Sequence, residues 1–340
     1  MTKRRLTQVA EHAGVSEATV SRVLKGSPKV AGSTRELVLT ALDVCGIERP
    51  QRYRRERAAL IGLIVPDLQN PIFSAFTEAL CGLLKKRGLV PVLCTRTSDG
   101  ASEAHYIEML MDQHIGGLVF IGASYADAGP EQGQALRERN IPMVLLNAAD
   151  ENTGVAQVRV DDALAAEQAL QHLAALGHER IGMILGPVGH VPSARKLAGF
   201  ATFQSRRPEP AGDWRRFVAH ALFTMEGGAT ALPRLVEAGA TAVVCASDAL
   251  ALGAVRGARR LGLRVPQDLS VVGFDDSPYM VATDPPLTTA RQPVQAMALA
   301  VVASLGEQIN GRANANELVM FDTELVVRGS TAARVRESSR

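Results

Sequence analysis

The first fifty residues carry short stretches with the apolar spacing of helices. Apolar residues recur three or four positions apart over 6–13, which predicts a short helix. Gly14 can adopt the positive φ of a helix end, and Ser16 suits the N-cap of a second helix over 17–24. A third helix is predicted over 33–45. Two short helices joined by a glycine turn and braced by a third indicate a helix-turn-helix, although a plain helical cap on a larger domain has the same pattern.

The remainder of the chain alternates between short apolar runs and amphipathic segments. The predicted strands are 60–65, 89–94, 117–121, 143–146, 180–185, 242–246, 269–274 and 324–328. The predicted helices are 74–87, 102–113, 163–176, 194–204, 228–238, 248–261 and 294–310. Continuous Val, Ile and Leu runs are typical of parallel strands that are buried on both faces. These strands are too many for one small sheet, so we predict an α/β core of two doubly wound parallel-sheet subdomains.

The chain is expected to pass between the two subdomains three times, near 147–162, at 288–293 and at 320–323. The first subdomain then takes residues 60–160 and 291–320, and the second takes residues 161–290 and 321–330. The complete division is a helix-turn-helix domain over 1–48, a basic hinge or linker over 49–59, an effector-binding and dimerisation core over 60–330 and a polar tail over 331–340.

Composition narrows the class of protein. The chain has 340 residues, of which 46% are hydrophobic and 21% charged, so a disordered or coiled-coil protein is excluded. No apolar stretch approaches the roughly 20 residues that span a bilayer, and no apolar segment follows the basic N-terminus as in a signal peptide. The four cysteines have no metal-ligand spacing. We therefore expect a cytoplasmic protein with no membrane partner, metal or cofactor.

Charge is distributed unevenly along the chain. Residues 1–60 hold twelve Lys and Arg against six Asp and Glu, a net charge of +6. The other 280 residues hold 25 basic against 29 acidic residues, a net charge of −4. A basic head on a mildly acidic body favours binding of the head to a polyanion such as DNA, although an unpartnered basic tail would have the same charge.

The segment Thr7-Gln-Val-Ala-Glu-His-Ala-Gly-Val-Ser-Glu-Ala-Thr-Val-Ser-Arg-Val-Leu-Lys-Gly26 resembles the LacI/GalR family of transcriptional regulators. Further segments of the chain are similar to landmarks of that family, namely 61–67, 70–73, 172–181, 247–253 and 271–276. The resemblance implies a periplasmic-binding-protein-like core that binds a small-molecule effector, such as a sugar, between its subdomains. It also implies a homodimer that binds double-stranded operator DNA, and hence nucleoid association. The C-terminal segment has no leucine heptad, so we do not expect a helical tetramerisation module.

The resemblance places base reading on the start of the second helix and on its arginine, hence on Glu17, Ala18 and Arg22. An arginine pairs with guanine through two hydrogen bonds, which is worth about 1–3 kcal/mol of discrimination. Small polar and lysine side chains suit phosphates, which position the protein without specifying sequence. The candidate DNA-binding residues are Leu6, Thr7, Ser16, Glu17, Ala18, Thr19, Ser21, Arg22, Lys25, Lys29, Arg54, Arg55 and Arg57.

The linker departs from the family pattern. Relatives join head and core through a hinge helix whose leucine wedges into the minor groove, whereas Arg57 stands at that position here and the linker is shorter. One hypothesis is that the arginines of 52–57 bind phosphates or a narrow minor groove. The other is a basic tether that only raises affinity for any DNA.

Effectors of such folds bind at the carboxyl ends of the strands. Polar and aromatic residues that follow the predicted strands are therefore candidates: Asp67, Asn70, Phe73, Ser124, Asn147, Asp161, Ser193, Arg195, Lys196, Phe223, Ser247, Asp248 and Asp275. Asp275 is the strongest, because it ends a fully apolar strand. For Asp248 helix capping is the favoured interpretation, and for Asp276 capping or a local salt bridge stands beside a role in the site.

Two of these positions depart from the family. Lys196 stands where many members carry an effector-binding arginine, and Asn147 stands where a carboxylate is expected. Since lysine lacks the two-pronged geometry of arginine, the resemblance does not carry over the class of effector.

Three function classes remain open at this point. A ligand-responsive DNA-binding repressor fits best. A small-molecule-binding protein of the same fold that acts without DNA is the alternative, and at a membrane it would need a signal peptide or lipid anchor. An α/β enzyme lacks support, because neither G-x-S-x-G nor G-x-G-x-x-G occurs in a suitable place. His172 and His178 are expected at the surface or in a cap.

Overall fold

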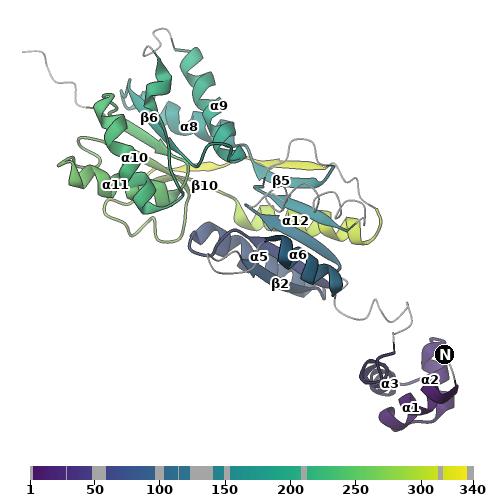
Figure 1. Cartoon of the computed structure of the whole chain (residues 1–340). Coiled ribbons are helices and arrows are strands. Elements are labelled where there is room, and N and C mark those ends of the chain that lie inside the picture. The colour runs from purple at the N-terminus through teal and green to yellow at the C-terminus, as the bar shows by residue number, and fades with distance from the viewer. Residues whose placement is uncertain are drawn as a thin grey trace, which may run out of the picture. The chain divides into compact units, whose positions relative to one another are not determined.

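The computed structural model describes residues 3–27, 29–47, 59–95, 103–113, 115–122, 141–148, 154–207, 213–312 and 317–334. They fall into two compact units, residues 1–59 and residues 60–340 (Figure 1).

The first unit is a three-helix domain made of α1 (Lys3–Ala13), α2 (Glu17–Leu24) and α3 (Gly32–Val44). Its core contains Val9, Val20, Val38 and Leu42, all fully buried. Ser16 caps α2, since its Oγ accepts the backbone N–H of Thr19 at 3.3 Å. The predicted helix-turn-helix is thereby confirmed.

The second unit contains two six-stranded sheets (Figure 1). The first has the order β11-β5-β4-β3-β1-β2 and is parallel throughout. Its strands are β1 (Leu60–Val65), β2 (Val90–Thr95), β3 (Gly117–Ile121), β4 (Met143–Leu146), β5 (Ala156–Val160) and β11 (Leu318–Phe321). The second has the order β12-β10-β9-β8-β6-β7, in which β12 alone pairs antiparallel. Its strands are β6 (Ile181–Leu185), β7 (Val218–His220), β8 (Ala242–Cys245), β9 (Ser270–Asp275), β10 (Thr288–Arg291) and β12 (Glu324–Val326).

Helices between the strands complete two α/β subdomains, which confirms the predicted fold class. The first sheet is accompanied by α5 (Pro71–Lys86), α6 (Glu103–Asp112) and α12 (Val294–Ile309), with α12 packed against α5. The second is accompanied by α8 (Asp162–Ala175), α9 (Val191–Ser205), α10 (Met225–Glu237), α11 (Asp248–Arg260) and the 3₁₀ turn η2 (Trp214–Phe217).

The chain passes between the sheets at three places: from β5 into α8, from β10 into α12, and from β11 to β12. These crossings bring the end of β5 and the residue after β10 to the junction of the two subdomains. Residues 331–334, which the sequence assigns to a polar tail, are hydrogen-bonded to the second subdomain, since Ala332 N–H reaches Ser270 Oγ at 3.1 Å and Arg334 N–H reaches Leu176 O at 2.8 Å.

Four strands, β5, β7, β10 and β11, have no counterpart among the predicted strands. The sequence of β10 is Thr-Thr-Ala-Arg, which is not an apolar run although its first three residues are buried. Residues of β5 alternate between buried and half-buried, with Gln157 and Arg159 on the less buried side. β7 has three residues, and β11 is an edge strand that alternates between exposed and half-buried. A search for continuous apolar runs misses such strands, because only strands buried on both faces produce them.

The expectation of a surface or capping role is wrong for His178, whose side chain is buried. Its Nδ1 lies 2.9 Å from Thr241 Oγ1, and its Nε2 lies 3.0 Å from Ser270 Oγ and 3.1 Å from the carbonyl of Ala332. His172 contacts Thr331 Oγ1 at 3.0 Å. The two histidines therefore hold the C-terminal segment against the second sheet, and burial lowers the pKa of both.

A loss of stability below about pH 6.5 follows from these two lowered pKa values. Between the folded and unfolded pKa values the unfolded chain binds more protons, so the free energy of unfolding falls as pH falls through this window and levels off below the folded pKa. We expect His178→Gln, which keeps a hydrogen-bonding side chain but does not titrate, to flatten this dependence. Urea unfolding at a series of pH values measures it, and an unchanged slope in the variant would refute the assignment.

Candidate effector cavity and DNA-reading helix

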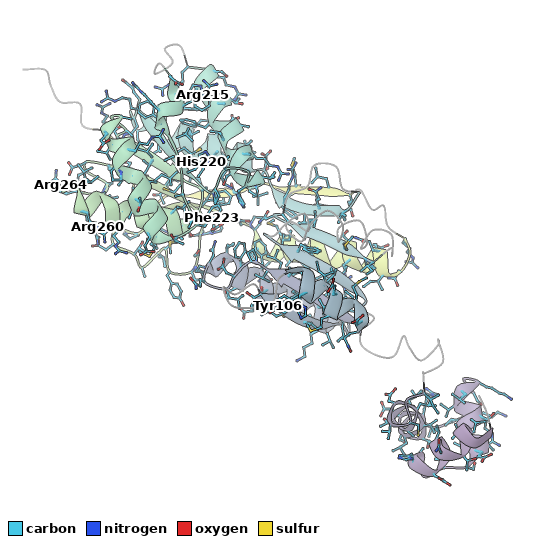
Figure 2. All side chains as sticks on the ribbon, in the orientation of Figure 1. Tyr106, Arg215, His220, Phe223, Arg260 and Arg264 are labelled. Atoms are coloured by element: carbon cyan, nitrogen blue, oxygen red, sulfur yellow. The ribbon has the colours of Figure 1, made fainter. Side chains whose placement is uncertain are left out.

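A cavity of about 710 Å³ lies where the carboxyl ends of strands from both sheets meet. A volume of that size suits a small-molecule ligand. Predicted residues that line it are Asp67, Asn70, Phe73, Asn147, Ser193, Lys196, Phe223, Ser247 and Asp275. Phe223 is labelled in Figure 2. Asp161, Arg195 and Asp248 are outside this lining, and Ser124 lies outside the described residues.

The wall from the first subdomain is shaped by a turn and a helix start. Asp67 Oδ1 accepts the backbone N–H groups of Gln69 and Asn70 at 2.8 and 2.9 Å. Asn70 in turn caps α5 through a 3.3 Å bond from Ile72 N–H. Beyond the cap, Phe73 packs directly on Gly122, where a Cβ would collide with the ring. A turn, a cap and a glycine thus fix one aromatic and two polar side chains on this wall.

A chain of side-chain hydrogen bonds crosses the cavity from one subdomain to the other. Asn147 Oδ1 accepts Val160 N–H at 3.1 Å, and Asn147 Nδ2 donates to Gln292 Oε1 at 2.6 Å. Gln292 Nε2 donates to Asp275 Oδ1 at 2.7 Å. Gln292, which follows β10 in a crossing segment, was not proposed from the sequence. Its position within 288–293, where the chain is expected to cross between the subdomains, is the sequence signal that could have identified it.

Asp275 projects into the cavity from a strained turn at the end of β9. Its φ is +116° and that of Asp276 is +56°, both in the region that side chains rarely adopt. Asp275 is buried, and burial together with the nearby charge of Asp248 raises its pKa well above the usual range, whereas Gln292 and Lys196 act in the opposite direction. Asp275 is thus the most strongly perturbed acid of the cavity, which suits an exchange of hydrogen bonds with a polar ligand.

Two neighbouring aspartates stabilise that turn from outside the cavity. Asp248 accepts Ser277 N–H at 2.7 Å and the hydroxyl of Thr289 at 2.6 Å, and burial raises its pKa to about 6. The favoured capping interpretation is wrong for Asp248, because Ser247, whose extended backbone permits capping, accepts the N–H of Leu250 instead. Asp276 forms salt bridges of 2.7 Å each with two arginines, Arg291 and Arg328.

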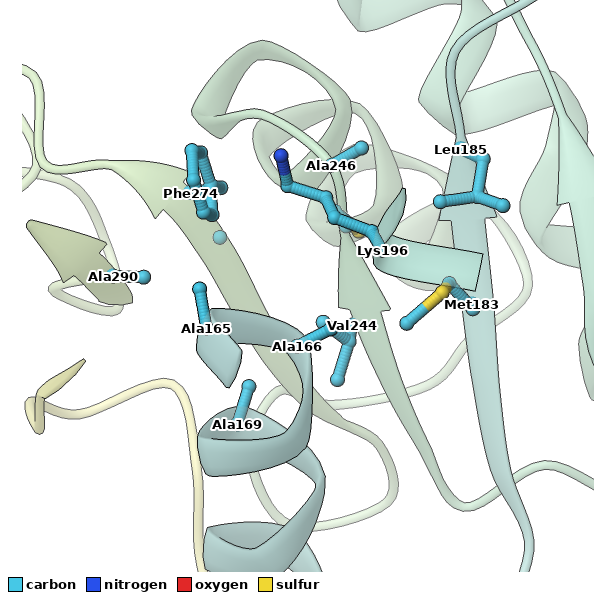
Figure 3. A pocket seen from close by; sticks show the side chains of 12 residues that line it. Ala165, Ala166, Ala169, Met183, Leu185, Lys196, Val244, Ala246, Phe274 and Ala290 are labelled. Atoms are coloured by element: carbon cyan, nitrogen blue, oxygen red, sulfur yellow. The ribbon is translucent and has the colours of Figure 1, made fainter. Parts of the chain in front are cut away.

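Lys196 is the cation of the cavity wall, and it is buried. Its Nζ forms an ion pair with Asp162, the first residue of α8, and lies 3.7 Å from the centre of the Phe274 ring. Arg195 Nη1 is 3.9 Å from the other oxygen of Asp162. Figure 3 shows the lysine extended among small apolar side chains with its amine towards Phe274. Asp162 was not proposed from the sequence, which favoured the adjacent Asp161; Asp161 caps α8 at Leu164 N–H, 3.0 Å away.

The helix α2 presents a polar face on the first unit. Glu17, Ala18, Arg22 and Lys25 are exposed, while Thr19 and Ser21 are half-buried. Thr7 Oγ1 donates to Glu17 Oε1 at 2.6 Å, a link between α1 and α2. These side chains can contact a partner without unfolding the domain.

Lys29 is also exposed on the first unit, whereas Leu6 is half-buried against the core of the head. Arg54, Arg55 and Arg57 lie outside the described residues.

Gln292→Glu is expected to destabilise the core by about 1–3 kcal/mol, because a carboxylate cannot donate to Asp275 and would face another acid. Urea unfolding measures this loss, and it should shrink at acidic pH as the acids are protonated. Gln308→Glu is the matched control. Gln308 also makes two hydrogen bonds, to Met143 N and O, but away from the cavity, so its penalty should lack the repulsion from Asp275 and depend less steeply on pH. Equal pH profiles for the two variants would contradict the geometry.

A helix-turn-helix domain joined to a two-subdomain core with a ligand-sized cavity defines a DNA-binding regulator that responds to a small molecule. Comparison with protein families agrees with this class. The profile described as bacterial regulatory proteins, lacI family, matches residues 5–46, and that of the periplasmic binding protein-like domain matches residues 170–331.

The chain is 48% identical to the HTH-type transcriptional regulator reg1 of Streptomyces lividans, over 99% of each chain. It is 47% identical to the HTH-type transcriptional regulator MalR of Streptomyces coelicolor, again over 99% of each chain. The chain belongs to the LacI family of transcriptional regulators and is not an enzyme.

Solved structures support the fold over almost the whole chain. The transcriptional regulator CelR in complex with cellobiose superposes with a TM-score of 0.70 at 28% identity, covering 96% of this chain and 99% of that one. The Lac repressor dimer bound to operator and the anti-inducer ONPF gives a TM-score of 0.72 at 28% identity, covering 96% and 98%. Among the described residues, no helix is long and apolar enough to cross a membrane.

Proposed function

We propose that this protein is a homodimeric repressor whose affinity for a palindromic operator is controlled by a sugar-like effector in the cavity. The cavity of about 710 Å³, with acidic, amide and aromatic side chains from both subdomains, carries the proposal. Carboxylates and amides exchange hydrogen bonds with hydroxyl groups, and aromatic rings cover the C–H faces of sugars. The cellobiose complex of CelR supports this class of effector. A protein of this function acts on the nucleoid.

The proposed DNA contacts are divided by chemistry. Arg22 and Ala18 read base edges in the major groove, with Glu17 held beside them by Thr7. The polar residues at the start of α2, together with Lys25 and Lys29, bind phosphates and fix the position of the helix. In this arrangement the head supplies both affinity and specificity.

The proposed dimer uses an edge of the first sheet. β2 ends the strand order, and its Val90 and Leu93 are exposed. An edge strand with exposed apolar side chains is normally covered by another surface. A second copy related by a two-fold axis covers it and presents two heads to the half-sites of a palindrome.

For the linker we propose that its arginines act on the operator rather than on DNA in general. Replacing Arg54, Arg55 and Arg57 together by Ala should weaken operator binding by about ten-fold or more, with a smaller effect on unrelated duplexes. Fluorescence anisotropy with both kinds of DNA measures the two losses. Equal losses would instead identify a basic tether.

Selection of bound duplexes from random DNA, repeated with cellobiose, maltose and ribose, tests the proposal as a whole. We expect a palindromic sequence to be enriched and one sugar to change its recovery. Enrichment that no sugar alters would reject the effector class and keep the DNA-binding function.

A further inference from the structure

The structure assigns the cavity to an uncharged ligand. We propose that it rejects anions such as sugar phosphates and sugar acids. In this proposal Asp162 sets the selectivity, because its carboxylate forms an ion pair with the Lys196 amine that an anion would otherwise bind. The inference rests on the proposed function, in which the cavity is the effector site. It addresses a question that the sequence leaves open, namely which class of effector the cavity binds when Lys196 stands where relatives carry an effector-binding arginine.

Lys196 is already provided with partners inside the protein. Its amine pairs with Asp162 and lies 3.7 Å from the centre of the Phe274 ring, which also attracts a cation. Its carbon chain lines a small apolar pocket together with alanines of α8 (Figure 3). An anionic ligand would have to compete with a buried carboxylate for this amine, and the displaced Asp162 would stay buried with only Arg195, 3.9 Å away, as its counter-ion.

The charges on the described lining do not favour an anion. Asp67, Asp162 and Asp275 share the lining with a single lysine, so acidic side chains outnumber lysines three to one. Burial raises the pKa of Asp275, and without Asp275 the acids still outnumber the lysine two to one. His190 also lines the cavity, and its Nδ1 accepts the backbone N–H of Ser193 at 3.4 Å.

Five helices, α5, α8, α9, α10 and α11, begin beside the cavity, and helix N-termini commonly bind anions. Here each of these five N-termini carries a capping side chain. The caps are Asn70, Asp161, His190, Thr224 and Ser247, and each accepts one backbone N–H from the first turn of its helix. Each cap removes one of the amide donors that a phosphate or carboxylate would use, so these N-termini are weaker anion sites than uncapped ones.

What remains for a ligand is a set of hydrogen-bonding groups and aromatic rings. Asp275 and Gln292 present carboxyl and amide groups, and Phe73 and Phe223 lie on opposite walls of the cavity, one from each subdomain. His190 meets Phe223 edge to face, with ring centres 4.9 Å apart, which fixes the ring. An uncharged polyhydroxylated molecule with an apolar face fits this combination.

Calorimetric titration of the full-length protein with paired probes tests the inference. The pairs are cellobiose with its uronic acid and maltose with its uronic acid, and inorganic phosphate is titrated separately. The wild-type protein should bind the uncharged member of a pair at least about ten-fold more tightly, and phosphate should give no saturable heat. Asp162→Asn should narrow that ratio by about ten-fold and create phosphate binding, because Lys196 loses its partner.

Glu167→Gln is the matched control, since Glu167 lies on the same helix but pairs with the exposed Arg206 at 2.8 Å. It should behave as wild type. Should Asp162→Asn fail to fold, the double variant Asp162→Asn/Lys196→Met decides the question, because removing both charges should leave the wild-type ratio and create no phosphate binding.

Wild-type binding of phosphate or a uronic acid that disappears in Lys196→Met would overturn the inference. Unchanged selectivity in Asp162→Asn would also overturn it. If no disaccharide binds, the sugar assignment of the proposed function fails, while the phosphate titrations still decide whether the cavity rejects anions.

Discussion

Arg22→Ala is expected to remove most of the discrimination between the operator and unrelated DNA. Arg22 is exposed on α2, where its guanidinium is free of the domain's core and can pair with guanine through two hydrogen bonds. The loss should amount to about 1–3 kcal/mol, or roughly 5- to 150-fold in affinity, for each half-site. In a symmetric dimer both half-sites lose this free energy. Anisotropy titrations of operator and scrambled duplexes measure it.

Lys25→Ala is the control for charge alone. Lys25 is also exposed and lies three residues further along the same segment. Because a lysine that binds a phosphate adds affinity for any duplex, its replacement should weaken binding to both DNAs similarly and reduce the salt dependence of the affinity. If Arg22→Ala behaved in the same way, the assignment of base reading to Arg22 would be wrong.

Asp275→Ala is expected to abolish the response to effector while leaving binding to the operator without effector near the wild-type level. Its carboxyl group is buried at the cavity wall and hydrogen-bonded to Gln292. Removal of a buried hydrogen-bonding partner costs about 1–3 kcal/mol, so effector affinity should fall by roughly 5- to 150-fold. Titration with the sugar found by the selection experiment gives this affinity.

Asp276→Ala separates a role in the site from a role in the fold. The two aspartates are adjacent, and both have positive φ, but Asp276 forms salt bridges with Arg291 and Arg328 rather than lining the cavity. Its replacement should lower the melting temperature and retain effector affinity. The account of Asp275 fails if both variants lose effector binding equally at a temperature where both are folded.

Local patterns were sufficient for the elements whose environment is uniform. The helix over 17–24 and the strand over 60–65 were predicted to the residue, because one has a clear N-cap and stop and the other is apolar throughout. β5 was missed because Gln157 and Arg159 interrupt its apolar pattern. Its place in the sheet comes from pairing with β4 and β11, and the latter is 158 or more residues further along the chain.

In the candidate site, too, some residues were predictable from the local sequence and others were not. Asp275 and Asn147 were identified because residues that follow parallel strands gather at one edge of a sheet. Gln292 and Asp162 were missed because their importance depends on partners 17, 145 and 34 residues away in sequence, and nothing local to either residue indicates those partners. The state of Lys196 also depends on the folded arrangement, since neither its ion pair nor Phe274 is near it in sequence.

The central claim is that the cavity and the DNA-reading helix are energetically coupled. The most direct measurement is operator affinity with and without the active sugar, together with the affinity for that sugar with and without operator. Linkage requires the two ratios to be equal, and we expect a common factor of roughly 5- to 150-fold, or about 1–3 kcal/mol. A factor of one in both directions, or no preference for any duplex over bulk DNA, would contradict the account.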